Sequence, residues 1–494
     1  MNKFRQLWSN LRSSFWFVPS LIVLFSIALA VALIEADSVV RDLLPAQWSR
    51  LFGAGAEGAR GMMSTIAGSM MTVVGVTFSM ILVVLALASS QYTSRILRNF
   101  MRSGVTQIVL GIFAGIFTYC LLVLRTIRSG DEGAFVPDLA VFFGFVLALG
   151  GVGALMFFIH HIASSIQAAS IIASVAQETI AAIDRLLPER RGEGPTEDDD
   201  DQTLRPLTER NWCTVPAKES GYIQSVNDAA ILRLARDRKH IVWMEHGIGD
   251  FVVQNTTLAA FSMEDPPDED MIAALQATFS ISSHRLVEQD AAFGIRQIVD
   301  VALRALSPGI NDTTTAVMCV DYLTAILARI APRQIPSSRR YEEGELRVIA
   351  KGPSFESLLA ESFDQIRGSA NSNVAVMLRM LSALQTVASL TAIPGRRRAL
   401  RDQVQWIAEL AERTIESAHD RVRIDTRLAR VREALETEPT LCPRELWSSA
   451  QSTSDTRRVK QQALGRWENE GGEIPQHAQT NAADLSTHEE PAKT

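Results

Sequence analysis

Long uncharged stretches dominate the first third of the chain. No Asp, Glu, Lys or Arg occurs between Arg12 and Glu35, and three further uncharged stretches cover residues 61–94, 103–124 and 139–177. Each stretch can cross the roughly 30 Å hydrocarbon core of a bilayer, which takes a helix of about 20 residues. The pattern predicts four transmembrane helices in a membrane domain of residues 1–165, with spans near 15–34, 63–88, 106–125 and 138–159.

Beyond the membrane domain the pattern changes several times. Residues 166–187 keep helical periodicity without a helix breaker, which predicts that a helix leaves the bilayer and continues into the cytosol. Pro, Gly and an acidic run mark residues 188–210 as a solvated linker. Residues 211–265 contain short runs rich in Ile, Val, Tyr and Trp, which predict a small β-barrel-like module. Residues 266–440 return to helical patterns, and the polar composition of residues 441–494 predicts a disordered tail.

The charged residues separate the two parts of the chain. Residues 1–165 contain 11 basic and 7 acidic residues, a net charge of +4, so the total of −7 leaves −11 for the remainder. Nucleic-acid binding usually requires a basic surface, so this acidic remainder argues against nucleic acid as a partner. The expected fold class is a mainly α membrane protein with four transmembrane helices, then a small β-barrel-like module and an α-helical cytosolic domain.

The basic residues also predict the orientation of the chain. The first 12 residues and the loop at 89–105 each carry three basic residues and no acidic ones, whereas the other two loops mix Arg with Asp and Glu. Because basic residues are enriched on the cytoplasmic side, we expect both termini to be cytoplasmic. The first uncharged stretch is longer than a signal-peptide core and three more follow, so we expect an uncleaved anchor.

One polar loop, RALSPGINDTTTA, lies between two amphipathic helical segments and has two interpretations. In the first, Pro308 ends a helix and Gly309 supplies a positive φ near its C-terminus. Asn311 or Asp312 then accepts backbone N–H groups at the start of the next helix, so capping explains nearly every residue. In the second, Asp290, Asn311 and Asp312 converge on a metal or phosphate, as the ligand site of a membrane-bound enzyme or sensor.

The second predicted span carries small or hydroxylated residues at intervals of three or four, which places them on one helix face. They are Ser64, Gly68, Thr72, Gly75 and Ser79. Such a face can pack closely against another helix. Alternatively, it can line the pore of an ion or small-solute channel formed by a symmetric homo-oligomer. No ionisable side chain lies inside a predicted span, which argues against an ion-coupled transporter.

Three segments carry a resemblance to a known family: FSMILVVLALASSQYTSRILRNF, QDAAFGIRQIVDVALRALSPGINDTTTA and CVDYL. Over most of residues 10–435 the chain resembles a family of predicted bacterial inner-membrane proteins that is itself named a domain of unknown function. The resemblance implies a multi-pass inner-membrane protein with four N-terminal spans and a cytosolic domain, and it brings no catalytic residues. Thr313 stands where we expect the family to carry Pro, and the first helical position accepts either, which favours capping.

Motifs of the common enzyme classes do not occur in the sequence. It contains no P-loop, H-E-x-x-H, G-x-S-x-G or paired C-x-x-C, and its G-x-G-x-x-G match, GAGAEG, has no preceding strand. The four cysteines show no metal-ligand spacing. We therefore expect no catalytic residue, metal or cofactor. The expected protein is non-enzymatic and oligomeric, with a regulatory or scaffolding cytosolic domain, and its partners are the lipid bilayer and further copies of the chain.

Overall fold

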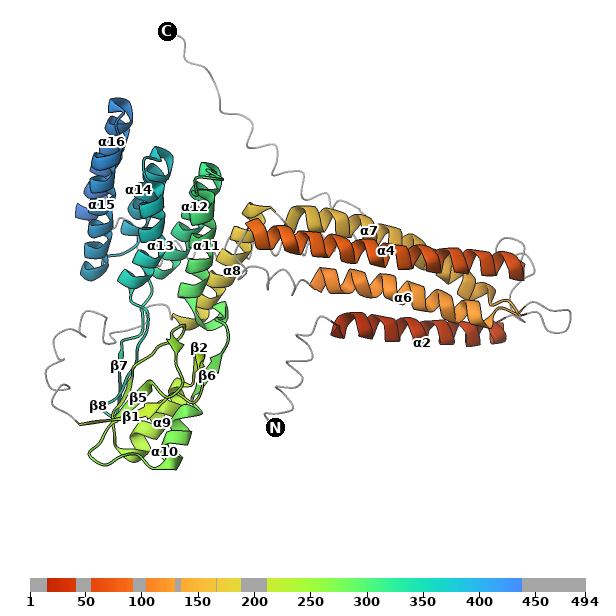
Figure 1. The fold of residues 1–494 in the computed structure, drawn as a ribbon, viewed down its shortest axis with the longest axis horizontal. Coiled ribbons are helices and arrows are strands. Elements are labelled where there is room, and N and C mark those ends of the chain that lie inside the picture. The colour runs from red at the N-terminus through yellow and green to blue at the C-terminus, as the bar shows by residue number, and fades with distance from the viewer. Residues whose placement is uncertain are drawn as a thin grey trace, which may run out of the picture.

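The structure, a computed structural model, has two parts (Figure 1). A long bundle of apolar helices comes first, and a β module and a helical domain follow it. The predicted linker at 188–210 and the predicted tail at 441–494 lie outside the described residues. The described residues are 16–40, 55–91, 104–128, 135–165, 167–187 and 211–437.

Five helices within the described ranges are long and apolar enough to cross a membrane, judged by length and composition. The first four coincide with the predicted spans and form what we call the apolar bundle. They are α2 (Phe17–Val40), α4 (Ala56–Gln91), α6 (Gly104–Thr126) and α7 (Asp138–Ser165). The fifth, α12 (Thr313–Ile330), lies in the helical domain and was not among the predicted spans.

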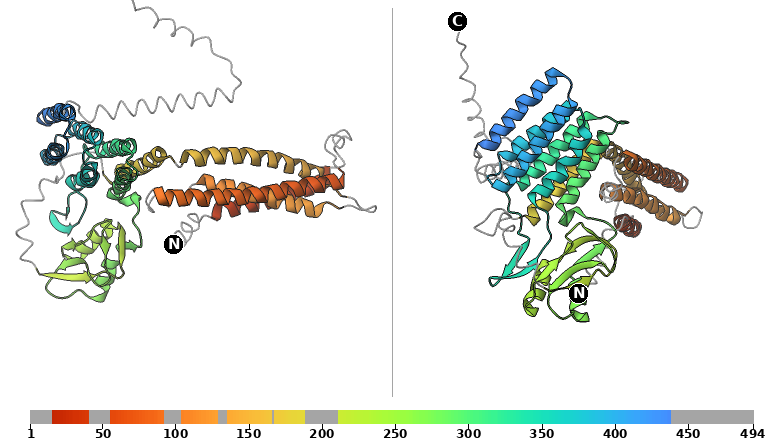
Figure 2. Two further views of the ribbon diagram at one scale, coloured as in Figure 1. Left: turned by 45° about the horizontal axis from the view of Figure 1, so that its top comes forward. Right: turned by 60° about the vertical axis from the view of Figure 1, so that its left-hand side comes forward.

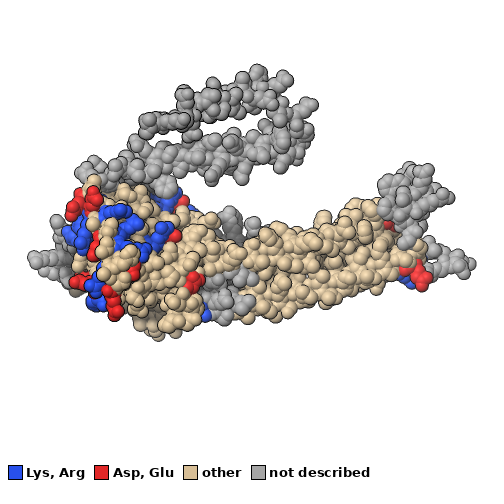
Figure 3. Space-filling model, turned by 90° about the horizontal axis from the view of Figure 1, so that it is seen from above, with Lys and Arg blue, Asp and Glu red and all other residues tan. Residues whose placement is uncertain are grey.

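Helix α6 is the most buried member of the apolar bundle because α2, α4 and α7 all contact it. Glycine permits the closest of these contacts: a Cβ added to Gly115 would lie 2.5 Å from the Ser26 hydroxyl oxygen on α2. Large apolar side chains such as Leu24 and Phe25 face outward, each 66% exposed. The visible face of the bundle is free of charged side chains over most of its length, as a lipid-facing surface requires (Figure 3).

Polar contacts close one end of the apolar bundle. Asp37, near the end of α2, is only 5% exposed, and its Oδ1 accepts the N–H of Leu139 at the start of α7 at 3.1 Å. Arg60 of α4 donates from Nη2 to the carbonyl of Ile127 at 2.7 Å. The sequence placed Asp37 in a loop after the first span, whereas α2 continues past it. Its carboxylate therefore caps α7 across the bundle, where the helix dipole favours negative charge.

Helix α8 (Ala168–Leu186) follows α7 but is a separate helix. Gln167 has an extended backbone, with φ −65° and ψ 132°, so the continuous helix predicted across 166–187 is interrupted there. α8 turns away from the direction of α7 (Figure 1) and packs against α11 and α12. Five of its buried residues belong to the core of the helical domain: Ile172, Val175, Ala176, Ile183 and Leu187, the C-cap.

The helical domain consists of three antiparallel helix pairs stacked side by side (Figures 1 and 2). Contacts between pairs run from α11 through α13 to α15 in one layer and from α12 through α14 to α16 in the other. Such stacking buries a continuous core. Besides α12, the three pairs consist of α11 (Ala291–Ala305), α13 (Phe355–Ala370), α14 (Val374–Ala388), α15 (Pro394–Thr414) and α16 (Ala418–Glu436).

The β module contains two open sheets, so the predicted barrel-like closure is not confirmed. Their strand orders are β1-β5-β3-β8-β7 and β4-β2-β6. The strands are β1 (Trp212–Pro216), β2 (Gly221–Val226), β3 (Val242–Met244), β4 (Phe251–Val252), β5 (Thr257–Ser262), β6 (Phe279–Ser282), β7 (Arg339–Glu342) and β8 (Glu345–Ile349). Two helices, α9 (Asp228–Arg238) and α10 (Glu269–Gln276), contribute to its core.

The β module extends well beyond the sequence-based boundary at residue 265. Strands β7 and β8 follow α12 in the chain, yet β8 pairs with β3 in parallel, with Val348 opposite Val242. The helix pair α11–α12 is therefore inserted between strands of one sheet.

Candidate functional site

The three residues predicted to form a ligand site do not converge. Asp290 directly precedes α11, whereas Asn311 and Asp312 follow its C-terminal end. A helix of 15 residues is about 22 Å long at 1.5 Å per residue. Asp290 is buried, with 6% of its surface exposed, whereas Asn311 and Asp312 are exposed. A single metal ion or phosphate cannot contact all three.

Asp290 connects the β module to the helical domain. Its Oδ1 accepts the backbone N–H of Phe293 at 3.0 Å as the N-cap of α11, and its Oδ2 accepts from Nε of Arg285 at 2.8 Å. The Arg285 guanidinium also lies over the Phe293 ring, 5.1 Å from its centroid. A Cβ on Gly249, which has φ +91°, would lie 2.5 Å from Asp290 Oδ2. The buried carboxylate is thus paired and enclosed, as structural ion pairs are.

A polar turn next to this ion pair runs from His246 to Asp250. Asp250 Oδ2 accepts from the Gly247 N–H at 3.0 Å and lies 3.1 Å from the Lys351 ammonium. Burial raises the pKa of Asp250, but the Gly247 N–H and Lys351 outweigh burial, so its pKa lies below the ordinary value. Within the described ranges no group of three or more His, Cys, Asp or Glu could hold a metal ion.

The loop between α11 and α12 caps the second helix. Asp312 accepts the backbone N–H of Thr315 at 3.0 Å and its hydroxyl at 2.5 Å. The expected positive φ at Gly309 is wrong: Asn311 adopts it instead, at +48°. Asn tolerates the left-handed region better than most residues because its short side chain can hydrogen-bond locally. Thr313 accepts from the Asn373 amide at 2.7 Å, which ties the loop to the start of α14.

Replacement of Asp312 by alanine is expected to lower the free energy of unfolding by about 1 kcal/mol, the usual loss for an N-cap. The hydrogen bonds from the Thr315 hydroxyl and backbone N–H lower the pKa of Asp312. Its charged form therefore stabilises the fold above the ordinary Asp pKa, and this contribution is lost as the pH falls through the lowered pKa. Urea unfolding at several pH values checks both points. Asp312→Asn keeps an acceptor for the Thr315 N–H but loses the charge and the second acceptor, so it should lose the pH dependence and part of the stability.

The five small residues of α4 face away from the other described helices of the apolar bundle. Ser64, Gly68, Thr72, Gly75 and Ser79 are all exposed, and a Cβ on either glycine would meet nothing within 4 Å. The Thr72 hydroxyl donates to the carbonyl of Gly68 at 3.0 Å, so it is satisfied within the helix. Within the described ranges the stripe therefore packs against no other helix of its own chain, so it is available for contact with lipid, water or another copy.

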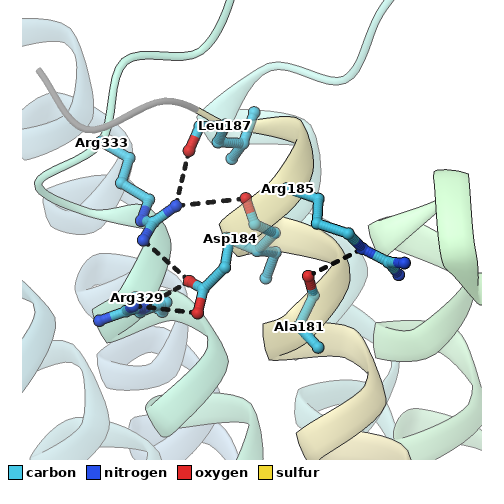
Figure 4. Close-up of polar contacts among 7 residues, drawn as sticks. Ala181, Asp184, Arg185, Leu187, Arg329 and Arg333 are labelled. Atoms are coloured by element: carbon cyan, nitrogen blue, oxygen red, sulfur yellow. Dashed lines mark hydrogen bonds and ion pairs between the residues drawn. The ribbon is translucent and has the colours of Figure 1, made fainter.

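Helix α8 is fastened to α12 by a carboxylate between two guanidinium groups (Figure 4). Asp184 accepts from Arg329 Nε at 2.6 Å and Nη2 at 3.0 Å, and Arg333 Nη2 lies 2.8 Å from its Oδ1. Arg333 also donates to the carbonyl of Leu187 at 2.6 Å, at the C-terminal end of α8. Cations at this end of a helix satisfy free carbonyls and complement the helix dipole. We call this cluster the α8 clamp.

Helices α8 and α11 approach each other closely where Gly294 of α11 faces Thr179 of α8. A Cβ on Gly294 of α11 would lie 1.9 Å from the Thr179 hydroxyl oxygen and 2.9 Å from its Cβ. Thr179 is fully buried, and its hydroxyl donates to the carbonyl of Val175 at 2.7 Å. Glycine is therefore required at position 294 for α8 to sit at this distance.

Two buried arginines at the start of α15 close the ends of other helices. Arg396 is 2% exposed and stacks over the Phe355 ring, 5.2 Å from its centroid. Its Nη1 donates to the carbonyls of Ile330, Ala331 and Arg333 at 3.4, 3.0 and 2.8 Å. Arg397 donates to carbonyls at or just beyond the C-terminal ends of α14 and α16, namely those of Ala388, Thr391, Ala434, Leu435 and Thr437.

Comparison with known proteins places this architecture in a family. Residues 12–386 match the family described as "Predicted membrane protein (DUF2254)". The chain belongs to this family. It is 31% identical over 454 residues to the uncharacterized protein Rv1290c of Mycobacterium tuberculosis (strain ATCC 25618 / H37Rv), covering 90% of this chain and 85% of that protein. Uncharacterized protein Mb1321c of Mycobacterium bovis is similar to the same extent. No solved structure matches the chain.

The family match spans the features that join the two parts of the molecule. It includes the apolar bundle, the α8 clamp and the Asp290 ion pair, and it ends within α14. These proteins are predicted membrane proteins of unknown function, and several apolar helices here agree with that description.

Proposed function

We propose that the chain is a multi-pass protein of the bacterial inner membrane with four spans, α2, α4, α6 and α7, and with both termini in the cytoplasm. The arginine-rich loop between the second and third spans supports this orientation. The β module and the helical domain then form one cytosolic part.

Helix α12 remains in the cytosol in this proposal although it is apolar. It lies in the core of the helical domain, where Cys319, Val320 and Leu323 are fully buried. Its surface carries ion pairs from Asp321 to Arg379 and from Arg329 to Asp184, which would be costly in lipid.

The proposed function is regulatory or scaffolding, and non-enzymatic: the cytosolic part and the membrane spans act as one mechanically connected unit. The observation that carries this proposal is α8, which follows α7 directly and is buried in the core of the helical domain. A flexible tether would expose its residues to water, whereas α8 is held by the α8 clamp and by the contact at Gly294. A change in the helical domain would then reach α7 through α8.

Replacement of Asp184 by asparagine tests this connection. The change removes the charge between Arg329 and Arg333, and for a carboxylate whose side chain is 37% exposed we expect a loss of about 1 kcal/mol. Amide hydrogen exchange of the full chain in nanodiscs should rise about fivefold in α8 and in the adjoining last turns of α7. Arg185→Gln is the matched control, because the exposed Arg185 bonds only within α8 in Figure 4. Faster exchange confined to α8 would show that the two parts move independently.

The second candidate function is a channel, and the exposed stripe on α4 is the observation that favours it. Because Gly68, Thr72 and Gly75 face away from their own bundle, a pore lined by them would have to form between copies. The same face would also suit an oligomer without a pore. The mass of the protein in nanodiscs separates these cases: a monomer or dimer has too few α4 helices to enclose a water path, whereas a larger ring keeps the channel under test.

A further inference from the structure

A groove of about 510 Å³ lies on the face of the five-stranded sheet that points away from the core of the β module. Its lining includes the indole rings of Trp212 on β1 and Trp243 on β3, which pack edge to face with centroids 5.2 Å apart and planes at 80°. Between these strands, Ala260 of β5 lies opposite Trp243 in register, and its small side chain leaves space for the groove. The volume is within the range of roughly 300–1,000 Å³ that is typical of small-molecule sites.

Among its lining residues the groove has one carboxylate, that of Glu245, and one imidazole, that of His246, but no Lys or Arg. Glu245 lies two residues beyond Trp243 and therefore on the same side of the extended chain. Its side chain is exposed and forms no hydrogen bond or ion pair with any residue in the described ranges. The imidazole of His246, whose Nδ1 lies 3.7 Å from Asp250 Oδ2, and three hydroxyl groups complete the polar lining; the hydroxyl groups are those of Thr214, Thr256 and Thr257.

The chemistry of this lining selects for a positive charge. The face of an indole ring is electron-rich and attracts ammonium groups, most strongly where two rings meet and a carboxylate is near. Trp243 is 40% exposed on a sheet face, although burial of such a side chain would stabilise the protein. We propose that the groove binds a small organic cation of the alkylated ammonium class, seated against Trp212 and Trp243 with Glu245 as its counter-ion.

The position of the groove favours a water-soluble ligand over a lipid headgroup. The β module lies beyond one end of the apolar bundle, beside the helical domain, in Figures 1 and 2. Quaternary ammonium groups occur in both sources, so the test must separate them. The site would bind its cation equally in a scaffold or in a regulator, and it stands independently of the proposed function.

Calorimetric titration of tetramethylammonium chloride into the full chain, held in nanodiscs of phosphatidylglycerol, tests the site, with sodium chloride as the blank. We expect saturable binding that Trp243→Ala weakens at least tenfold and Trp243→Phe weakens less, because Phe gives a weaker cation–π interaction. Glu245→Gln should weaken binding about threefold to tenfold. Glu345→Gln, which changes an exposed carboxylate at the end of β8, is the matched control and should bind as the unaltered chain does.

Three results would overturn the proposal. They are the absence of saturable binding, binding that is unchanged in Trp243→Ala when circular dichroism shows an intact fold, and binding of maltose but not tetramethylammonium, which would reassign the groove to neutral saccharides. Added phosphatidylcholine vesicles distinguish the sources. Displacement of tetramethylammonium would support the ligand class and identify a lipid headgroup, whereas unchanged binding would support the class with a soluble ligand.

Discussion

Replacement of Arg396 by methionine is expected to lower the free energy of unfolding by about 2 kcal/mol, roughly 1 kcal/mol for each of two carbonyls that lose their bond from Arg396. These are the carbonyls of Ala331 and Arg333, where α12 ends, whereas the Ile330 carbonyl also accepts the Arg333 N–H at 2.9 Å. Methionine keeps the unbranched apolar stem but lacks the guanidinium group, so the loss reports on these hydrogen bonds and on the stacking over Phe355. Urea unfolding followed by circular dichroism measures the change.

Arg398 provides the matched control for this substitution. It lies two residues further along α15 and is exposed, so Arg398→Met should change stability by less than about 0.5 kcal/mol. Arg396→Lys retains the charge but has one nitrogen in place of a planar fork, and we expect it to recover only part of the loss. Equal effects of Arg396→Met and Arg398→Met would mean that the α12 carbonyls do not depend on the guanidinium.

Replacement of Gly294 by alanine is expected to cost about 2 kcal/mol, because overpacking of a well-packed contact costs about 1–3 kcal/mol. The new methyl group would overlap the Thr179 hydroxyl and approach two of its carbon atoms at 2.9 Å. β-branched Thr179 has little rotameric freedom in a helix, so α8 must move away from α11. Alanine also has a higher helix propensity than glycine, by about 1 kcal/mol, so the cost of the clash has to exceed this gain for the variant to be less stable.

A double substitution makes this prediction specific. Thr179→Ala removes the hydroxyl at 1.9 Å and the methyl group at 2.9 Å but keeps the Cβ, so Gly294→Ala combined with Thr179→Ala should recover part of the stability, and the coupling energy of the cycle reports the contact itself. Gly368→Ala in α13 is the control, because a Cβ there meets nothing within 4 Å and should stabilise the helix by about 0.5–1 kcal/mol. The failure of Thr179→Ala to rescue Gly294→Ala would show that the cost arises elsewhere.

Local patterns in the sequence predicted those features of the fold that depend on neighbouring residues. The four apolar helices, α8 and the cap at Asp312 follow from hydropathy, periodicity and capping chemistry, and each is present. The position of the positive φ was missed because both Gly309 and Asn311 can adopt it and only the closed loop selects one.

Contacts between segments that are distant in the chain could not be predicted from local patterns in the sequence. The three arginines of GRRRAL look alike in sequence, and two are buried only because the ends of α12, α14 and α16 meet beside α15. Asp290 and Asp312 both cap helices, so their residue types suggested a common site, yet α11 separates them. The stripe on α4 was visible in the sequence, but its direction depends on how the four helices pack.

The parallel pairing of β3 with β8 has a consequence for synthesis on the ribosome. Strand β3 ends at Met244, and its partner begins at Glu345, about a hundred residues later. Until β8 emerges, one edge of β3 lacks its neighbour and can pair with other chains. The sheet of a nascent chain therefore stays incomplete while the whole α11–α12 pair is translated. A fragment ending at residue 265 would lack β8, so this edge of β3 would remain unpaired.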